Sequence, residues 1–163
     1  MNDGGKFVCF DDLDIWTDQG HCLVYSFGIS TDWTFEDRMD QLGCTVHAFD
    51  PTVEYPARRG RGIHFTRLGL AAQHTKLAEG SMGTAFTLDT IMAGNNHSNS
   101  IINYLKVDIE GYEVAALEQW IESGEFQVLP YFTNKECPTF IAVFVKVSKK
   151  TCLVLISQGK FLI

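Results

Sequence analysis

Residues 24–36 read VYSFGISTDWTFE, and this stretch decides the fold. An apolar run stops at Gly28, small polar residues follow, and Asp32 stands where a helix would begin. A strand, a glycine turn and a helix in this order are typical of the ligand-binding end of an α/β sheet. The stretch therefore predicts a ligand site directly after the first strand.

The same alternation of strands and helices continues along the chain. Apolar runs predict strands and amphipathic periodicity predicts helices. The expected strands are residues 21–27, 45–49, 63–68 and 101–107, and the expected helices are residues 32–42, 71–82 and 111–123, with a short amphipathic turn at 87–92. This order predicts an α/β fold with a Rossmann-like, largely parallel sheet and helices on both faces, which places a ligand beyond the carboxyl ends of the strands.

The helix predicted at residues 32–42 carries the clearest local signals. Asp32 is the expected N-cap, and Gly43 is the expected stop. Three apolar residues repeat on one face and should pack inward. These residues are Phe35, Met39 and Leu42. Two acids fall in the first turn, where the helix dipole favours negative charge. They are Glu36 and Asp37.

Composition limits the class of protein. The 163 residues are 45% hydrophobic, which suits a domain with a substantial core. The formal charge of −7 would repel a phosphate backbone, so no nucleic acid partner is expected. No apolar run approaches the ~20 residues of a membrane span, and the first residues lack the apolar core of a signal peptide. The five cysteines form no CxxC pair, so we expect no metal site and mostly free, packed thiols.

Three residues stand where predicted strands end: Gly28, Asp50 and Asp108. Gly28 lets the backbone turn tightly and approach a ligand closely. Asp50 follows at nearly the ~20-residue spacing at which an acid meets the ribose hydroxyls of an adenosine cofactor. Each residue alone is more often a simple turn glycine or a solvated acid, but the pair at this spacing favours an adenosine cofactor.

The turn after the first strand favours S-adenosylmethionine over a dinucleotide. A pyrophosphate needs bare backbone N–H groups and normally a GxGxxG motif, whereas this turn reads GISTD. Asp32 and the first-turn acids would place negative charge against phosphates. S-adenosylmethionine has no phosphate and carries a sulfonium and an ammonium group, so an acidic rim suits it.

Several segments resemble the S-adenosylmethionine-dependent methyltransferases of the FkbM-related group, in particular its animal branch of methyltransferase-like proteins. They are DGGKFVC (3–9), VYSFGISTDWTFE (24–36), HAFDPT (47–52) and, most specifically, YLKVDIEGYEVAALEQW (104–120). The resemblance covers about residues 3–126. It implies a Rossmann-like methyltransferase that moves a methyl group to an oxygen or nitrogen acceptor by in-line displacement. A small-molecule or glycan acceptor is the expected substrate.

The resemblance also implies roles for individual residues. Gly28 would lie in the glycine motif, and Asp50 would hold the ribose. The expected cofactor contacts are Ser26, Phe27, Gly28, Asp50, Pro51 and Asp108. The expected residues near the transfer site are Asp108, Glu110 and Glu113. Read without the family, acids in the first turn of a helix also stabilise that helix with no catalytic role.

The C-terminal segment departs from the family. We expect a methyltransferase domain over residues 1–127 and an atypical segment over 128–163, where two β-rich runs, 141–147 and 151–156, predict a hairpin that completes or replaces the sheet edge. The sequence leaves the localisation open: it contains no targeting segment, while a longer form with a different N- or C-terminus could carry an export signal and be secreted or luminal. Two other readings stay open: a shortened, inactive relative, and a nicotinamide-dependent oxidoreductase.

Overall fold

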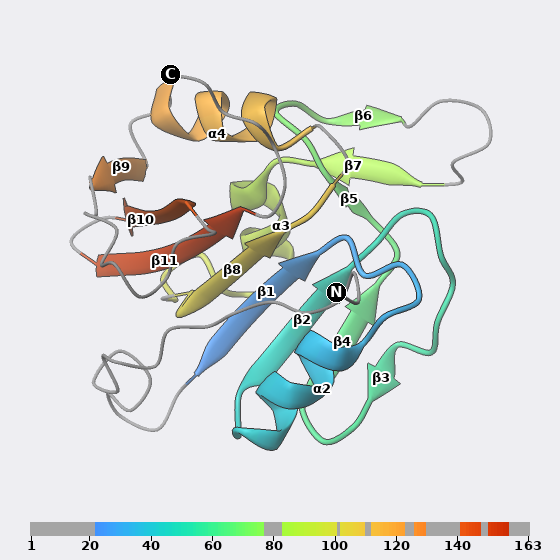
Figure 1. Ribbon diagram of the computed structural model, residues 1–163. Helices are drawn as coiled ribbons and strands as arrows, with labels where there is room; N and C mark the ends of the chain where they lie inside the picture. The colour runs from blue at the N-terminus through green and yellow to red at the C-terminus, as the bar shows by residue number, and fades with distance from the viewer. Residues whose placement is uncertain are drawn as a thin grey trace.

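The computed structural model describes residues 22–76, 83–100, 102–109 and 112–122, together with the strands at 126–129, 141–147 and 150–156. These residues form an α/β fold with one eight-stranded and one three-stranded sheet (Figure 1). In spatial order, the large sheet contains β3 (Arg58–Arg59), β4 (Ile63–Thr66), β2 (Thr45–Phe49), β1 (Leu23–Phe27), β8 (Tyr104–Val107), β11 (Lys150–Ile156), β10 (Ile141–Val147) and β9 (Phe126–Leu129). The small sheet contains β5 (Gly69–Leu70), β7 (Thr84–Phe86) and β6 (Thr75–Lys76).

The large sheet is mixed, which corrects the expectation of a largely parallel sheet. Strands β4, β2, β1, β8 and β11 pair in parallel. Strand β3 pairs antiparallel with β4, and β10 pairs antiparallel with both β11 and β9. For β3–β4 and β10–β11 the short connections force this direction, because parallel neighbours need a crossover of a dozen or more residues. Strands β10 and β11 are separated by two residues, and they lie between β8 and β9 rather than at the sheet edge.

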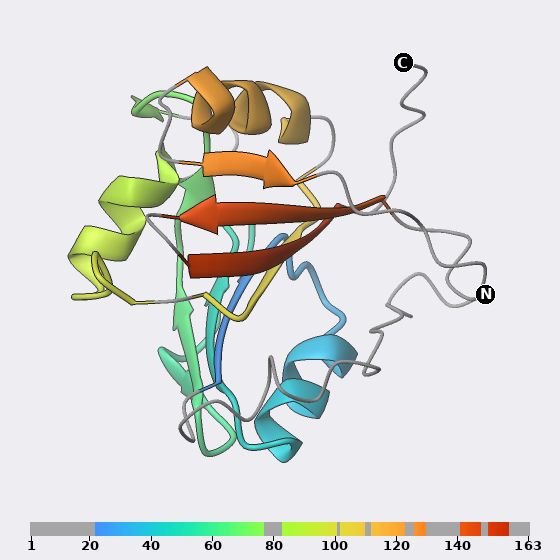
Figure 2. The same cartoon turned by 90° about the vertical axis from the view of Figure 1, so that its left-hand side faces the viewer.

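Helices cover both faces of the sheet (Figure 2). On one face, α2 (Thr34–Gln41) packs Phe35 and Met39 onto β1, β2 and β4. On the other face, α3 (Leu88–Gly94) and α4 (Glu113–Glu122) share a core cluster with β1, β2 and β8. None of the helices in the described ranges is long and apolar enough to cross a membrane.

The ends of α2 confirm one prediction and correct two. Gly43 ends the helix with φ +88°, and its N–H donates to the Asp40 carbonyl while the Cys44 N–H donates to the Met39 carbonyl. This pair of bonds is a Schellman motif. Asp32 is not the N-cap, because Trp33 holds that position. The Asp32 side chain, one residue before the N-cap, still accepts the Thr34 N–H. Leu42 is 45% exposed, because the helix is already ending there.

The segment around residues 69–94 differs from its prediction. Residues 71–76 contain strand β6 and no helix, and residues 77–82 lie outside the described part of the chain. The expected short turn at 87–92 is instead the helix α3. Its apolar residues Leu88, Ile91 and Met92 are buried. Their packing in the core stabilises a helix that is longer than the single turn predicted from the sequence.

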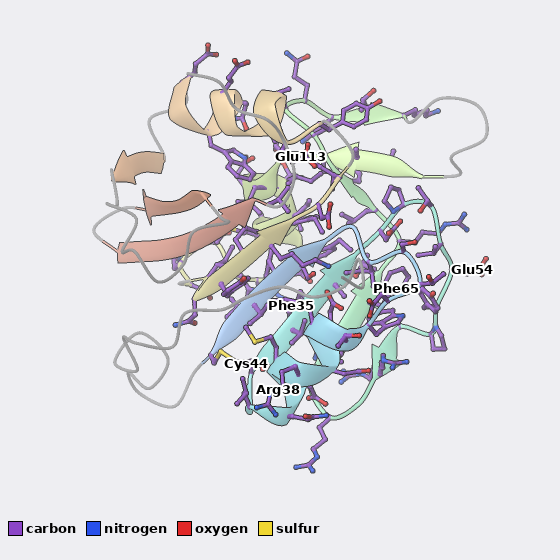
Figure 3. All side chains as sticks on the ribbon, viewed as in Figure 1. Phe35, Arg38, Cys44, Glu54, Phe65 and Glu113 are labelled. Atoms are coloured by element: carbon purple, nitrogen blue, oxygen red, sulfur yellow. A yellow bond between two sulfur atoms is a disulfide. The ribbon has the colours of Figure 1, made fainter. Side chains whose placement is uncertain are left out.

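A disulfide joins Cys22 and Cys44, a pairing that the expectation of mostly free thiols did not include. Leu23 and Thr45 are register partners in the parallel pair β1–β2, so the residues that precede them lie side by side. Figure 3 shows the disulfide at Cys44 beside the start of β1. It closes the 22-residue segment that contains β1, the glycine turn and α2.

Candidate functional site

Gly28 joins the ends of three neighbouring strands. Its φ of +78° lies in the left-handed region, and its N–H donates to the Phe49 carbonyl at the end of β2 at 2.9 Å. On the other side, the Asp108 N–H after β8 donates to the Phe27 carbonyl at 3.1 Å. A Cβ atom on residue 28 would overlap the Asp108 carbonyl, so only glycine allows these strand ends to meet this closely.

The Asp50 carboxylate organises the turn that follows Gly28. One of its oxygens accepts the N–H groups of Ile29 at 2.9 Å and Ser30 at 2.8 Å. The other accepts the N–H of Thr52 at 2.8 Å and the Thr52 hydroxyl at 2.6 Å. An ionised carboxylate has about four acceptor positions, so the chain itself fills all of them here.

These bonds also set the charge of Asp50. Burial raises the pKa of this carboxyl, but hydrogen bonds from Thr52, Ser30 and Ile29 together outweigh burial and leave the pKa below its ordinary value. Asp50 is 4% exposed, so a fixed negative charge lies just beneath the turn.

Asp108 and Glu113 flank the loop after β8. Asp108 is half-buried at the strand end. The Glu113 carboxylate is 5% exposed and accepts the Ile109 N–H at 2.7 Å, so it closes the loop that links β8 to α4 (Figure 3). Glu110 lies outside the described residues. The catalytic roles of these three acids stay predictions.

The remaining predicted cofactor contacts lie close by but turn their side chains elsewhere. The Ser26 hydroxyl is fully buried and donates to Glu36 at 2.6 Å. The Phe27 side chain is buried in the core, stacked on Phe49. Pro51 lies beside Gly83, the residue before β7, where a Cβ atom on Gly83 would lie 2.6 Å from the Pro51 Cβ. Any contact of Ser26 or Phe27 with a ligand would therefore be through the backbone.

The sequence interpretation gave no role to Lys106 beneath this site. The Lys106 ammonium lies 3.1 Å from the Glu36 carboxylate and donates to the Gly28 carbonyl at 3.1 Å. Glu36 lies in the first turn of α2, where acids are usually solvated, yet it is fully buried. The alternation of side chains along a strand could have revealed this contact. Leu105 and Val107 face one core cluster, so Lys106 between them points to the opposite face of the sheet, where α2 lies.

An open groove of about 640 Å³ lies along the outer side of α2, not over the strand ends. It adjoins the turn at Tyr55, whose hydroxyl donates to the Ser30 carbonyl at 2.9 Å. The lining residues are Thr31, Trp33, Thr34, Asp37, Arg38, Gln41, Tyr55 and Arg59. Among the residues that the structure describes, no cluster of three or more His, Cys, Asp or Glu side chains could hold a metal ion.

Comparisons with known proteins give one positive result. No curated protein and no solved structure matches the chain significantly. A family model described as a methyltransferase domain matches residues 1–148. This match includes β1, β2, β8 and the three strand ends that meet at Gly28. Because it extends over most of the 163 residues, the chain belongs to the methyltransferase domain family.

Proposed function

We propose that this methyltransferase domain uses S-adenosylmethionine, bound across the carboxyl ends of β1, β2 and β8 in a Rossmann-like arrangement of the FkbM-related type. The observation that supports this most directly is the meeting of Gly28 with the ends of β2 and β8, above the buried carboxylate of Asp50. Ligands of open α/β sheets bind in this position. The proposed cofactor contacts are Ser26, Phe27, Gly28, Asp50, Pro51 and Asp108.

The hydrogen-bond donors of the turn fit S-adenosylmethionine better than a dinucleotide. A pyrophosphate would need free backbone N–H groups at the start of α2. Those of Ile29 and Ser30 already donate to Asp50, and that of Thr34 donates to Asp32. Two carboxylates therefore occupy three of the backbone donors near the start of α2, and their negative charge favours a positively charged ligand.

To bind a ribose, the Asp50 carboxylate would have to exchange one of its present hydrogen-bond donors for a ribose hydroxyl. Its four acceptor positions are filled, and the Thr52 hydroxyl is the partner that can rotate away at least cost, because Thr52 is exposed. A ribose hydroxyl would then donate to the oxygen that Thr52 released. The three backbone N–H groups would keep their bonds, so the turn would stay in place.

S-adenosylmethionine, when bound, supplies a methyl group on a positively charged sulfur for in-line displacement. The chain has to hold an oxygen or nitrogen acceptor, in a small molecule or a glycan, at near-attack distance; such positioning contributes up to ~7–11 kcal/mol in good cases. Asp108 is placed at the strand end where it could accept the acceptor's proton. Glu113 would position the loop that carries Asp108, and a role for Glu110 stays a prediction.

The test is calorimetric titration of the protein with S-adenosylmethionine and, separately, with NADH. We expect S-adenosylmethionine to bind more tightly. The Asp50→Ala variant should lose about 1–3 kcal/mol of binding free energy through its missing charge-assisted hydrogen bonds. The matched control is Thr52→Val, which removes only the hydroxyl that ribose would replace and should bind as well as the wild type.

Each other outcome points to a different reading. Tighter binding of NADH would favour a nicotinamide-dependent oxidoreductase. Binding of neither ligand by a cooperatively folded chain would favour an inactive relative. Equal affinity of Asp50→Ala and the wild type would remove Asp50 from the cofactor site.

A further inference from the structure

A buried ion pair lies between the sheet and α2, directly below the glycine turn. The Lys106 ammonium lies 3.1 Å from Oε1 of Glu36, and the two side chains are 7% and 0% exposed. The Ser26 hydroxyl donates to the same Glu36 oxygen at 2.6 Å. Ser26 and Lys106 are register partners on β1 and β8, so both strands and the helix contribute to this cluster.

The ion pair extends to the turn through a second bond of Lys106. Its ammonium donates to the Gly28 carbonyl at 3.1 Å, while the Gly28 N–H is held by the Phe49 carbonyl. Asp50 holds the next two N–H groups of the turn. Both sides of the Gly28 residue are thus fixed, its N–H by β2 and its carbonyl by Lys106 of β8.

Stabilisation of the fold does not by itself explain why Lys106 and Glu36 form a buried ion pair. Taking two charges out of water costs more than their attraction commonly returns, and well-packed apolar residues of similar volume are often as stable. Within the described part of the chain, the second carboxylate oxygen of Glu36 is also buried without a hydrogen-bond partner, which adds to the cost. What an apolar pair could not supply is a donor at the Gly28 carbonyl.

The rest of the pocket around Lys106 keeps the ammonium in one position. Its Nζ lies over the Phe35 ring at 5.6 Å from the centroid, and the aromatic face attracts a cation. Phe35 comes from α2, which lies in front of β2 and β4 in Figure 3. The ring, the Glu36 carboxylate and the Gly28 carbonyl surround the ammonium from the helix and the turn.

We propose that Lys106, held by Glu36 and Ser26, is a positioning residue that fixes the glycine turn in the conformation that receives the cofactor. This inference rests on the proposed function, because it assigns the turn to cofactor binding. Lys106 itself touches the turn and not the reacting atoms. Loss of the pair should therefore loosen Ile29 and Ser30 and weaken cofactor binding, while the surrounding fold remains.

The test compares two double variants of the full chain. Glu36→Met/Lys106→Met removes both buried charges together, so neither is left unpaired. The matched control, Asp37→Asn/Arg59→Gln, removes an exposed ion pair between α2 and β3. Amide hydrogen exchange at Ile29 and Ser30 reports on the turn, with the Tyr25 amide in β1 as internal reference, and calorimetry gives the dissociation constant for S-adenosylmethionine.

We expect the Glu36→Met/Lys106→Met variant to exchange about tenfold faster or more at Ile29 and Ser30, and its dissociation constant to rise by a similar factor, as loss of a hydrogen bond to a charged group implies. Exchange at Tyr25, and all values for the control, should match the wild type. If the double variant does not fold, Glu36→Gln/Lys106→Gln again removes both charges together but keeps polar side chains at the two positions. It should then change both readouts in the same direction by a smaller factor.

Two results would overturn the inference: unchanged exchange at Ile29 and Ser30, or faster exchange with an unchanged dissociation constant. Failure of the wild type to bind S-adenosylmethionine would instead reject the proposed function. The exchange rates, which need no ligand, would then decide by themselves whether Lys106 fixes the turn.

Discussion

The backbone of Asp108 passes so close to Gly28 that a Cβ atom on residue 28 would overlap the Asp108 carbonyl oxygen. The same residue has φ +78°, which side-chain-bearing residues rarely adopt. Two independent requirements for glycine therefore coincide at the point where β1, β2 and β8 end.

The first prediction concerns substitution of this glycine. Gly28→Ala should lower the free energy of unfolding by about 2–5 kcal/mol, of which roughly 1–2 comes from the left-handed backbone and 1–3 from the overlap. Gly43→Ala is the control, because its φ is +88° but no atom lies within 4 Å of the added Cβ. Gly43→Ala should lower the free energy of unfolding only by the contribution of the left-handed backbone, about 1–2 kcal/mol. Urea unfolding measures both, and equal losses would mean that the contact with Asp108 is unimportant.

The second prediction concerns the disulfide between Cys22 and Cys44, which closes a 22-residue segment. Loop-closure entropy for this length stabilises the fold by about 3 kcal/mol. Reduction with dithiothreitol should lower the free energy of unfolding by that amount in the wild type. The Cys22→Ser/Cys44→Ser variant should begin at the lower value and be insensitive to dithiothreitol. A wild type whose stability ignores the reductant would contradict the prediction.

Local signals in the sequence predicted the elements around the site well. Strand β2 has the predicted bounds, and β1 and α2 differ only at their ends. Gly43 ends α2 as expected because a C-terminal glycine acts through its own backbone. These features depend on residues close together in the chain, which is why one sequence sufficed to find them.

Features that depend on distant segments were missed or misread. The Cys22–Cys44 disulfide requires the parallel register of β1 and β2, and the Lys106–Glu36 pair joins two residues that are 70 positions apart in the chain. The hairpin of β10 and β11 was indicated by the local sequence, but its insertion between β8 and β9 depends on pairing with distant segments, which local signals do not give. The sequence places Asp50 at its strand end, but two of the four bonds to its carboxylate come from Ile29 and Ser30, about 20 residues earlier in the chain.

The third prediction concerns the pH dependence that Asp50 confers. Its folded-state pKa is depressed, so its contribution is present above the unfolded value of about 3.9 and is lost as pH falls through the folded value. Asp50→Asn should cost about 1–3 kcal/mol at pH 7 because the amide cannot replace the charged acceptor. The difference between the two proteins should shrink below about pH 4. Urea unfolding at several pH values measures the difference in stability between the two proteins. A difference that stays constant down to pH 2 would show that the charge of Asp50 does not contribute to stability.

The fourth prediction concerns a cluster of histidines on the face of the sheet that α3 covers. His47 stacks on His64 with ring centroids 5.0 Å apart and meets the edge of His97 at 4.9 Å. Burial, followed by repulsion from His97 and His64, lowers the pKa of His47 to about 4. Burial and nearby Arg58 lower the pKa of His64, and burial and His64 lower that of His97.

The sign of the pH effect follows from these directions. Between the unfolded pKa of about 6.5 and the folded value, the unfolded chain binds more protons, so stability falls as the pH falls through this window. His47 alone should account for up to about 3 kcal/mol between pH 6.5 and pH 4. His47→Phe keeps a flat ring in the stack but cannot titrate, so its stability should vary less with pH over this range. The exposed control His74→Gln should keep the wild-type slope, and a His47→Phe variant with that same slope would show that the cluster does not bring about the acid sensitivity.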